Sequence, residues 1–228
     1  MLVKEDLGID NLIIYQDTDL YKFTSDAVLL SHFAKAKKND VVADFCSGTG
    51  IVGLNFFALN GNLVKKVDLY EMQEASHNLA LKTIKENCLQ DVITPINTKI
   101  QDIDKAVNGA YSLILCNPPY MKADCGFNDP VYARAVCKVE LTITLKEIVL
   151  AGKRLLKHGG RFDMVHRADR LCEIIFELKS NGLEPKRIQF VTGADGKTPY
   201  LVLIESVKGG KEGVVLEPNI INAIKTEE

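Results

Sequence analysis

Seven apolar runs, each bounded by polar or turn-forming residues, set the pattern of this chain. Five are typical of buried strands, and two that flank Gly193-Ala194-Asp195-Gly196 are typical of a closing antiparallel pair. The five are 41–45, 67–71, 92–96 with Ile100, 113–115 and 161–166, and the pair is 188–191 and 200–207.

Helical patterns lie between these strands. They occupy the residues that follow the glycine-rich stretch at 46–53 as far as Leu59, and the ranges 75–87, 138–157 and 170–180. Gly159-Gly160 is expected to end the third of them. The alternation predicts an α/β protein with a mostly parallel sheet covered on both faces, made of five parallel strands and the antiparallel pair.

The first forty residues precede the first core strand. Apolar runs at 12–15 and 20–23 flank a turn-like Asp17-Thr18-Asp19, and a helix-start signal follows at Thr24-Ser25-Asp26. Asp26 fits a first-turn acid as well as it fits a ligand contact. We expect a single domain over 1–228, with an N-terminal hairpin and helix at 1–40, a core at 41–207 and a tail at 208–228.

Composition narrows the class of protein. The 228 residues are 46% hydrophobic and 25% charged, with a formal net charge of −2, so any nucleic-acid surface must be a local patch. The six cysteines show no C-x-x-C pair, which predicts reduced thiols in a cytoplasm and no metal site. The acidic N-terminus does not fit a signal peptide, and no apolar run approaches the ~20 residues of a membrane helix.

A glycine-rich loop follows the first core strand. Residues 46–53 fit G-x-G-x-x-G between a strand and a helix, where glycines allow a ligand to approach the backbone closely. Asp44 lies just ahead of the loop, where a carboxylate would repel a pyrophosphate and suit a ligand with an ammonium group. Glu71 ends the second strand 21 residues beyond Gly50, near the ~20 expected for an acid that binds ribose hydroxyls. Asp102, expected at the end of the third strand, could accept from an adenine amine or cap a turn.

The fourth strand ends in Asn117-Pro118-Pro119-Tyr120. The prolines end the strand and hold Asn117 and Pro118 extended. The Asn117 amide oxygen and the Pro118 carbonyl are acceptors that can hold both hydrogens of a planar –NH₂ group, and the Tyr120 ring can stack on a flat heterocycle. Bending that nitrogen toward tetrahedral aims its lone pair, so the reaction needs a strong electrophile. A proline turn with a capping asparagine is the alternative interpretation.

The chain resembles a known superfamily on these motifs. With Asp44, the glycines, Glu71, Asp102 and Asn117 to Tyr120 in this order, residues 24–207 resemble class I S-adenosylmethionine-dependent methyltransferases that act on amines. Residues 23–30 and 162–171 are similar to the bacterial tRNA (valine) adenine-N6 methyltransferases, whose substrate is the adenosine just 3′ of the anticodon. At 138–140 the chain has Lys-Val-Glu where related sequences more often carry Arg-His-Glu, which affects expected RNA contacts.

The resemblance implies a Rossmann-like fold, S-adenosylmethionine as cofactor, no metal, and tRNA as partner without a membrane or an obligate protein partner. It places Asp26 and Asp44 near the amino-acid end of the cofactor, Glu71 on its ribose and Asp102 on its adenine. The expected catalytic residues are Asn117, Pro118 and Tyr120. The expected cofactor-binding residues are Asp26, Asp44, Cys46, Gly48, Gly50, Glu71, Met72, Asp102 and Asn117. Basic residues expected to contact substrate are Lys122, Arg134, Arg167 and Arg170, with Lys35, Lys37 and Lys38 as further candidates beside the cleft.

Three rival functions stay open. A release-factor glutamine methyltransferase shares Asn-Pro-Pro-Tyr and the –NH₂ shape of its substrate, but it usually has an N-terminal helical domain for which residues 1–40 are too few. An rRNA guanine-N2 methyltransferase is also compatible with Tyr120. A degenerate methyltransferase fold that only binds RNA is the non-enzyme alternative, although every expected site position is filled. The loop at 121–132 could form a lid or a substrate wall.

Overall fold

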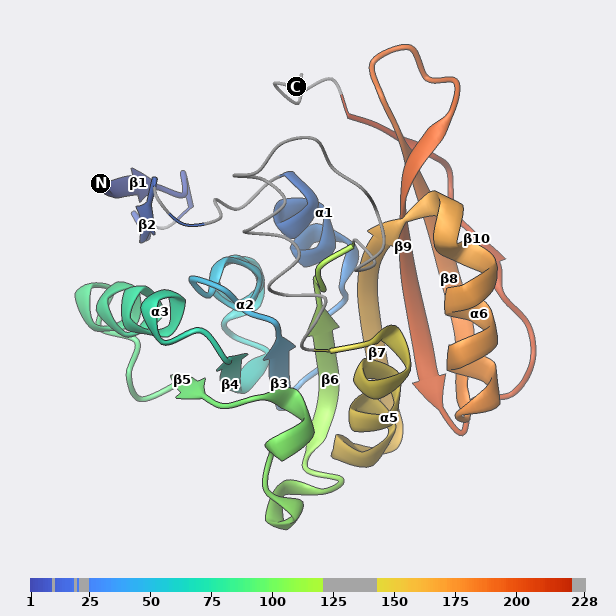
Figure 1. Ribbon diagram of the computed structural model, residues 1–228, viewed down its shortest axis with the longest axis horizontal. Coiled ribbons are helices and arrows are strands. Elements are labelled where there is room, and N and C mark those ends of the chain that lie inside the picture. Colours follow the sequence, from blue (N-terminus) through green and yellow to red (C-terminus); the bar gives the residue numbers. More distant parts are fainter. Residues whose placement is uncertain (10, 19, 21–24, 121–142, 223–228) are drawn as a thin grey trace.

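The computed structural model describes residues 1–9, 11–18, 20, 25–120 and 143–222. Within these ranges nine strands form one sheet in the order β10-β8-β9-β7-β6-β3-β4-β5, with β11 also paired to β8 (Figure 1). Their bounds are β3 (Asp40–Phe45), β4 (Val64–Glu71), β5 (Ile93–Asn97), β6 (Tyr111–Cys116), β7 (Leu156–Arg167), β8 (Leu183–Thr192), β9 (Pro199–Lys208), β10 (Val215–Leu216) and β11 (Ile220–Ile221).

The pairing confirms the predicted mostly parallel sheet. Strands β5, β4, β3, β6 and β7 pair in parallel, and β9 runs antiparallel between β7 and β8. The short strands β10 and β11 pair in parallel with β8. The described sheet has nine strands where seven were predicted, because residues 215–216 and 220–221, in the segment predicted as a tail, pair with β8.

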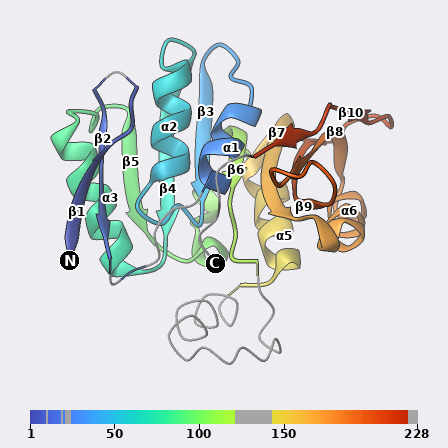
Figure 2. The same cartoon turned by 90° about the horizontal axis from the view of Figure 1, so that it is seen from above.

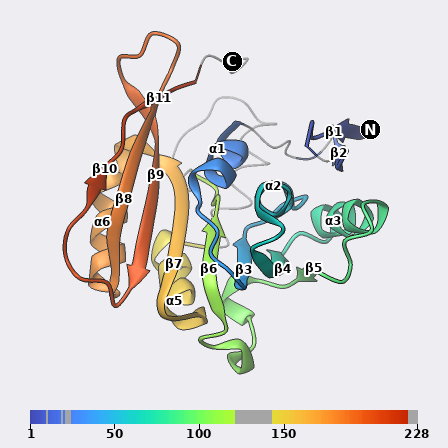
Figure 3. The same ribbon diagram turned by 180° about the vertical axis from the view of Figure 1, so that it is seen from behind.

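Helices cover both faces of the sheet. Helices α1 (Ser25–Phe33) and α2 (Ile51–Asn60) lie in front of the sheet in Figure 3, and α5 (Leu145–Leu155) and α6 (Leu171–Ser180) lie in front of it in Figure 1. Helix α3 (Glu74–Glu86) packs in the same core as α1 and α2. Alternate residues of β6 point to opposite faces, with Leu113 and Leu115 in one core and Ile114 and Cys116 in the other. Both faces are apolar because a parallel sheet is buried on both sides.

The N-terminal hairpin includes a strand that the apolar runs did not predict. Strand β2 (Ile13–Asp17) confirms the apolar run at 12–15, and it pairs antiparallel with β1 (Leu2–Asp6). Residues 21–23 of the run at 20–23 lie outside the described residues. The hairpin lies beside α3 (Figure 2), where the Tyr15 amide donates to Thr83 Oγ1 at 3.0 Å.

The helix predicted over 138–157 is shorter in the structure. It begins at Leu145, because Thr144 and Glu147 form a capping box, and residues 138–142 lie outside the described residues. It ends at Leu155, and Leu156 already pairs with Tyr111 in the sheet. Gly159, with a positive φ of 72°, therefore lies in an irregular stretch of β7 and does not end a helix.

Two buried arginines hold the C-terminal end of α1. The Arg187 guanidinium donates to the Phe33 carbonyl at 2.6 Å, and Arg161 donates to the Lys35 carbonyl and pairs with Asp40 at 2.5 Å. Carbonyls at a helix C-terminus need such partners. Because Asp40 opens β3, this end of α1 lies at the amino ends of the strands, and its first residues, including Asp26, point to the carboxyl ends.

Lys35, Lys37 and Lys38 share the position of that C-terminal end. The Lys37 amide donates to Asp40 Oδ2 at 2.6 Å, just before β3 begins. The glycine loop and Asn117 follow the opposite ends of β3 and β6. The prediction that these three lysines lie beside the cleft is therefore wrong.

Candidate active site

The loop between β3 and α2 is shaped by left-handed backbone at three positions. Cys46, Gly48 and Gly50 have φ values of 55°, 56° and 88°. A side chain at Gly50 would place its Cβ 2.8 Å from a methyl group of Leu69, so only glycine fits there. No heavy atom other than those of its chain neighbours lies within 4 Å of a Cβ built on Gly48. The loop thus offers backbone, without side-chain cover, to a ligand.

Asp44 lies beneath this loop and is fully buried. Its Oδ2 accepts from the Gly53 amide at 2.8 Å. Among the described residues, its Oδ1 has no hydrogen-bond partner, and neither has the hydroxyl of buried Ser47. Burial raises the pKa of Asp44 to about 8, and the Gly53 amide opposes this rise. A cationic group placed at Oδ1 would favour the ionised form, so the environment suits the ligand ammonium expected from the sequence.

Glu71, at the end of β4, is tied to the same loop. Its Oε2 accepts from the Gly48 amide at 2.9 Å and its Oε1 from the Gln73 amide at 2.7 Å. Burial raises its pKa, and the amides of Gln73, Gly48 and Met72 oppose that rise. Each carboxylate oxygen has a second lone pair, so the side chain, once ionised, can also accept from two hydroxyl groups.

Asp26 and Asp102 lie at the rim of this region. Asp26, in the first turn of α1, is 8% exposed, and the neighbouring Ser25 hydroxyl accepts from the Asn222 amide at 3.1 Å. Asp102 differs from its prediction, because β5 ends at Asn97 and Ile100–Asp102 forms a short 3₁₀ helix, η1. Ile100 is therefore not part of the strand. Asp102 is exposed at the end of η1, as a carboxylate that contacts a ligand from the rim would be.

Residues 117–120 follow β6 and lie beside the end of β3, because Cys116, the last residue of β6, pairs with Phe45. The Tyr120 hydroxyl donates to Asn117 Oδ1 at 2.7 Å, so ring and amide act as one unit. Pro118 is buried, while Asn117 and Tyr120 are half-buried. The side chains predicted from the sequence are thus gathered on one edge of the sheet: Asp44 near the end of β3 with the glycines after it, Glu71 at the end of β4, and the amide after β6.

The basic residues fall into three groups. Lys122 and Arg134 lie outside the described residues. The Arg167 side chain is 48% exposed and pairs with Asp169. The Arg170 side chain is only 14% exposed and contacts Glu173 and the Tyr120 carbonyl. Arg167 fits the predicted surface contact with substrate better than Arg170 does.

Sequence reasoning did not place His166 or Glu173 among the expected site residues. The His166 ring packs 5.0 Å from the Tyr120 ring, centroid to centroid, and Glu173 holds Arg170. A signal was available, because a histidine that ends a strand, followed by Arg170 and by Glu173 three residues later, can form one cluster at a strand–helix junction.

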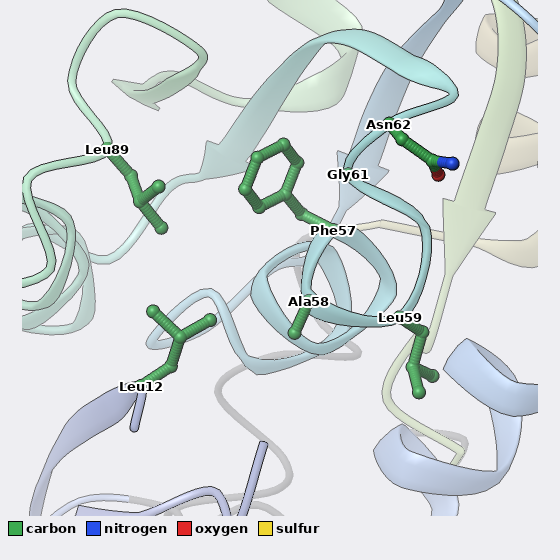
Figure 4. A pocket seen from close by; sticks show the side chains of 7 residues that line it. All are labelled: Leu12, Phe57, Ala58, Leu59, Gly61, Asn62 and Leu89. Carbon is green, nitrogen blue, oxygen red and sulfur yellow. The ribbon is translucent and has the colours of Figure 1, made fainter. Parts of the chain in front are cut away.

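Other features of the structure lie apart from this edge. A pocket of about 470 Å³ opens at the far end of α2, opposite the glycine loop (Figure 4). It is lined by Leu12, Phe57, Ala58, Leu59, Gly61, Asn62 and Leu89.

Among the described residues, no group of three or more His, Cys, Asp and Glu side chains could hold a metal ion. No helix in the described ranges is long and apolar enough to cross a membrane.

A sheet of this order, with a glycine loop after β3 and acids at the carboxyl ends of β3 and β4, defines a class I S-adenosylmethionine-dependent methyltransferase. The methyltransferase small domain family matches residues 24–180, and the chain belongs to this family. A similar relative is the tRNA1(Val) (adenine(37)-N6)-methyltransferase of Dyadobacter fermentans, 24% identical over 91% of this chain and 84% of its own. The enzyme of the same name from Parabacteroides distasonis is 24% identical over 84% of this chain and 79% of its own.

A solved structure supports the fold. A predicted O-methyltransferase from Agrobacterium tumefaciens superposes with a TM-score of 0.68 at 17% identity, covering 86% of each chain. At that identity the likeness establishes the architecture alone.

Proposed function

We propose that this methyltransferase modifies the exocyclic N6 amine of an adenosine in the anticodon loop of a tRNA. The observation that carries the proposal is the unit formed by Asn117 and Tyr120 at the end of β6, beside the glycine loop. The tRNA adenine-N6 methyltransferase activity for which the relatives from Dyadobacter and Parabacteroides are named supports the same substrate.

The residues of β3 and β4 would hold the cofactor. S-adenosylmethionine, when bound, supplies an electrophilic methyl group on a sulfonium. Asp44 Oδ1, which is buried and has no partner in the described ranges, fits its ammonium group, and Glu71 fits its ribose hydroxyls. We assign the remaining contacts to Asp26, Cys46, Gly48, Gly50, Met72, Asp102 and Asn117.

Asn117 and Pro118 would hold the target amine. In this proposal the Asn117 amide oxygen and the Pro118 carbonyl accept the two amine hydrogens, and the Tyr120 ring stacks on the adenine. The Tyr120 hydroxyl uses one lone pair of Asn117 Oδ1 at 2.7 Å, and the second lone pair is left for the amine. Positioning of the nitrogen in line with the methyl group supplies most of the catalysis, an effect that can reach ~7–11 kcal/mol.

An anticodon loop suits such a site physically. A loop base presents its amine and its face with little unpairing cost, whereas a paired base must first be extracted. Because the net charge of the chain is −2, affinity for RNA must come from a local patch, for which we propose Arg167, Lys122 and Arg134.

The rival functions differ in the product that they leave. Purified protein is incubated with labelled S-adenosylmethionine and either total tRNA or release factors, and each substrate is then digested. We expect the label in N6-methyladenosine from tRNA, with transfer at least about tenfold slower when Asn117 is replaced by alanine. Label in N5-methylglutamine, or in N2-methylguanosine, would replace this proposal with the corresponding rival, and an absence of transfer would favour the RNA-binding subunit.

A further inference from the structure

Two arginines of the same turn have different surroundings. Arg167 ends β7 and Arg170 ends the 3₁₀ helix that follows, η3 (Ala168–Arg170). The side chain of Arg167 is 48% exposed and bonds to Asp169, which is itself 57% exposed. The side chain of Arg170 is 14% exposed. A phosphate contact requires an accessible guanidinium, so Arg170 needs another explanation.

Arg170 connects α6 to the end of β6. Its Nε and Nη2 donate to the two oxygens of Glu173 at 3.1 and 2.8 Å. Its Nη1 donates to the Tyr120 carbonyl at 3.2 Å. The two-pronged bond to Glu173 fixes the plane of the guanidinium. The remaining nitrogen is thereby aimed at the backbone of Tyr120.

His166 supports the Tyr120 ring from the side. The two ring centroids are 5.0 Å apart with an angle of 44° between the planes. His166 is buried, and its Nδ1 accepts from the Arg167 amide at 2.8 Å. Burial, assisted by the charge of Arg170, lowers the pKa of His166 to about 3, so its ring is neutral at physiological pH. It serves Tyr120 as a packing surface.

Tyr120 in turn restricts the orientation of the Asn117 side chain. Its backbone is bonded to Arg170, its ring packs on His166, and its hydroxyl donates to Asn117 Oδ1. Three contacts at different atoms leave the ring little freedom. The orientation of the Asn117 amide, and thus of the acceptor for the target amine, depends on them.

We infer that Arg170 is a positioning residue of the methyl-transfer reaction, which fixes the Tyr120 platform and through it the Asn117 acceptor. This role rests on the proposed function of Asn117 and Tyr120. In this role Arg170 acts through Tyr120 and not by direct contact with cofactor or substrate. Glu173 shares the role because it holds the Arg170 guanidinium.

A substitution of Arg170 by lysine distinguishes a positioning role from a phosphate contact. Lysine binds phosphate as a point charge but lacks the planar fork that reaches Glu173 and Tyr120 together. We expect Arg170→Lys and Arg170→Gln each to lower kcat by about tenfold, the loss typical of one hydrogen bond to a charged group. The salt dependence of RNA binding should not change. Arg167→Lys and Arg167→Gln are the matched control variants. Arg167→Gln should raise KM and reduce the slope of log binding constant against log salt concentration by about 0.7–0.9.

A double-mutant cycle tests whether Arg170 acts through Tyr120. In a Tyr120→Ala background, Arg170→Gln should change kcat by less than about twofold, because coupled residues are not additive. The inference is overturned if Arg170→Lys has wild-type kcat, if the Arg170→Gln loss is the same in both backgrounds, or if that loss falls on KM with a smaller salt slope. If Arg170→Gln does not fold, Glu173→Gln replaces it, with Glu177→Gln one turn further along α6 as its control.

Hydrogen exchange provides a readout that needs no RNA. Arg170→Gln should speed amide exchange in the peptide that contains Asn117 and Tyr120, and leave a peptide from β4 unchanged. Unchanged exchange in the first peptide would contradict the inference even if the substrate is not tRNA. If wild-type enzyme labels a different substrate, the proposed function fails by itself, and the kinetic comparison is made on that substrate.

Discussion

At the scale of single residues, Asp44 and Glu71, the two acids proposed to hold the cofactor, each accept from the backbone of the glycine-rich stretch at 46–53. The Gly53 amide at the start of α2 donates to Asp44, and the Gly48 amide in the loop donates to Glu71. The backbone of this stretch therefore holds both carboxylates in place before a ligand arrives. A Cβ at Gly53 would lie 3.2 Å from Asp44 Oδ2 and 2.5 Å from a methyl group of Leu69, so the close approach depends on glycine.

Asn117→Ala tests the acceptor directly. The substitution removes the amide oxygen that accepts from the Tyr120 hydroxyl and that is proposed to hold the target amine. The interaction strengthens as the nitrogen becomes tetrahedral, so the loss should fall on kcat, by at least about tenfold, with a smaller change in KM. Steady-state kinetics at saturating tRNA would refute the assignment if turnover stayed near the wild-type value.

Glu71→Ala tests the cofactor contact. Hydrogen bonds to a charged group contribute ~1.5–3 kcal/mol, so the loss should weaken S-adenosylmethionine binding by at least about tenfold. Glu74→Ala, an exposed acid three residues later in α3, is the matched control and should bind normally. Calorimetric titration that finds equal affinity for both variants, with both folded, would contradict the role of Glu71.

At the scale of elements, α1 is held at both of its ends. Arg187 and Arg161 donate to carbonyls at its C-terminal end. At the other end, the Asn222 amide donates to the hydroxyls of Ser25 and Tyr200 at 3.1 and 2.8 Å. The strand segment from β10 to Asn222 thus returns along β8 to the edge that carries Asp26.

Asn222→Ala should weaken the attachment of this C-terminal segment to the start of α1. The lost bonds should lower the free energy of unfolding by about 1–2 kcal/mol, and S-adenosylmethionine binding should weaken as the start of α1 gains freedom. Asn219→Ala, on an exposed residue of the same segment, is the control. Denaturant unfolding and titration of both variants would oppose this account if the two behaved alike.

Much of this arrangement could be predicted from local sequence. The apolar runs gave the five parallel strands and the antiparallel pair because buried strands need continuous apolar residues. The ends of the helices were harder to predict, because a single hydrogen-bonded contact decides where each helix begins or ends. The Thr144–Glu147 capping box starts α5, and the pairing of Leu156 with Tyr111 ends it. The pairing of β2 with β1, and the contacts that join Tyr120 to His166 and Arg170, connect separate segments of the chain, which local spacing does not reveal.

At the scale of the whole molecule, charge is buried between α1 and the sheet. Asp163 is fully buried, and neither of its carboxylate oxygens has a hydrogen-bond partner within the part of the chain that the structure describes. Burial raises its pKa to about 8, with a further rise from Glu205 and opposition from Arg161 and Arg187. The folded state therefore binds a proton that the unfolded state has released.

This gives a defined dependence of stability on pH. Between the ordinary carboxyl pKa of about 4 and the raised value of about 8, the folded chain binds more protons than the unfolded chain. The contribution of Asp163 to the free energy of unfolding is therefore full below pH 4 and is lost as pH rises through 8. Asp163→Asn should flatten this part of the pH profile, whereas Asp195→Asn, on an exposed loop, should leave it intact. Thermal melts across pH 5–9 with the same slope for all three proteins would contradict the burial argument.

The most direct measurement of the central claim uses two tRNA transcripts. One is valine tRNA, and the other differs only by guanosine in place of the adenosine just 3′ of the anticodon. With labelled S-adenosylmethionine, we predict N6-methyladenosine at that position in the first transcript and no label in the second. Equal labelling of the two transcripts, or label in a release factor alone, would contradict the account.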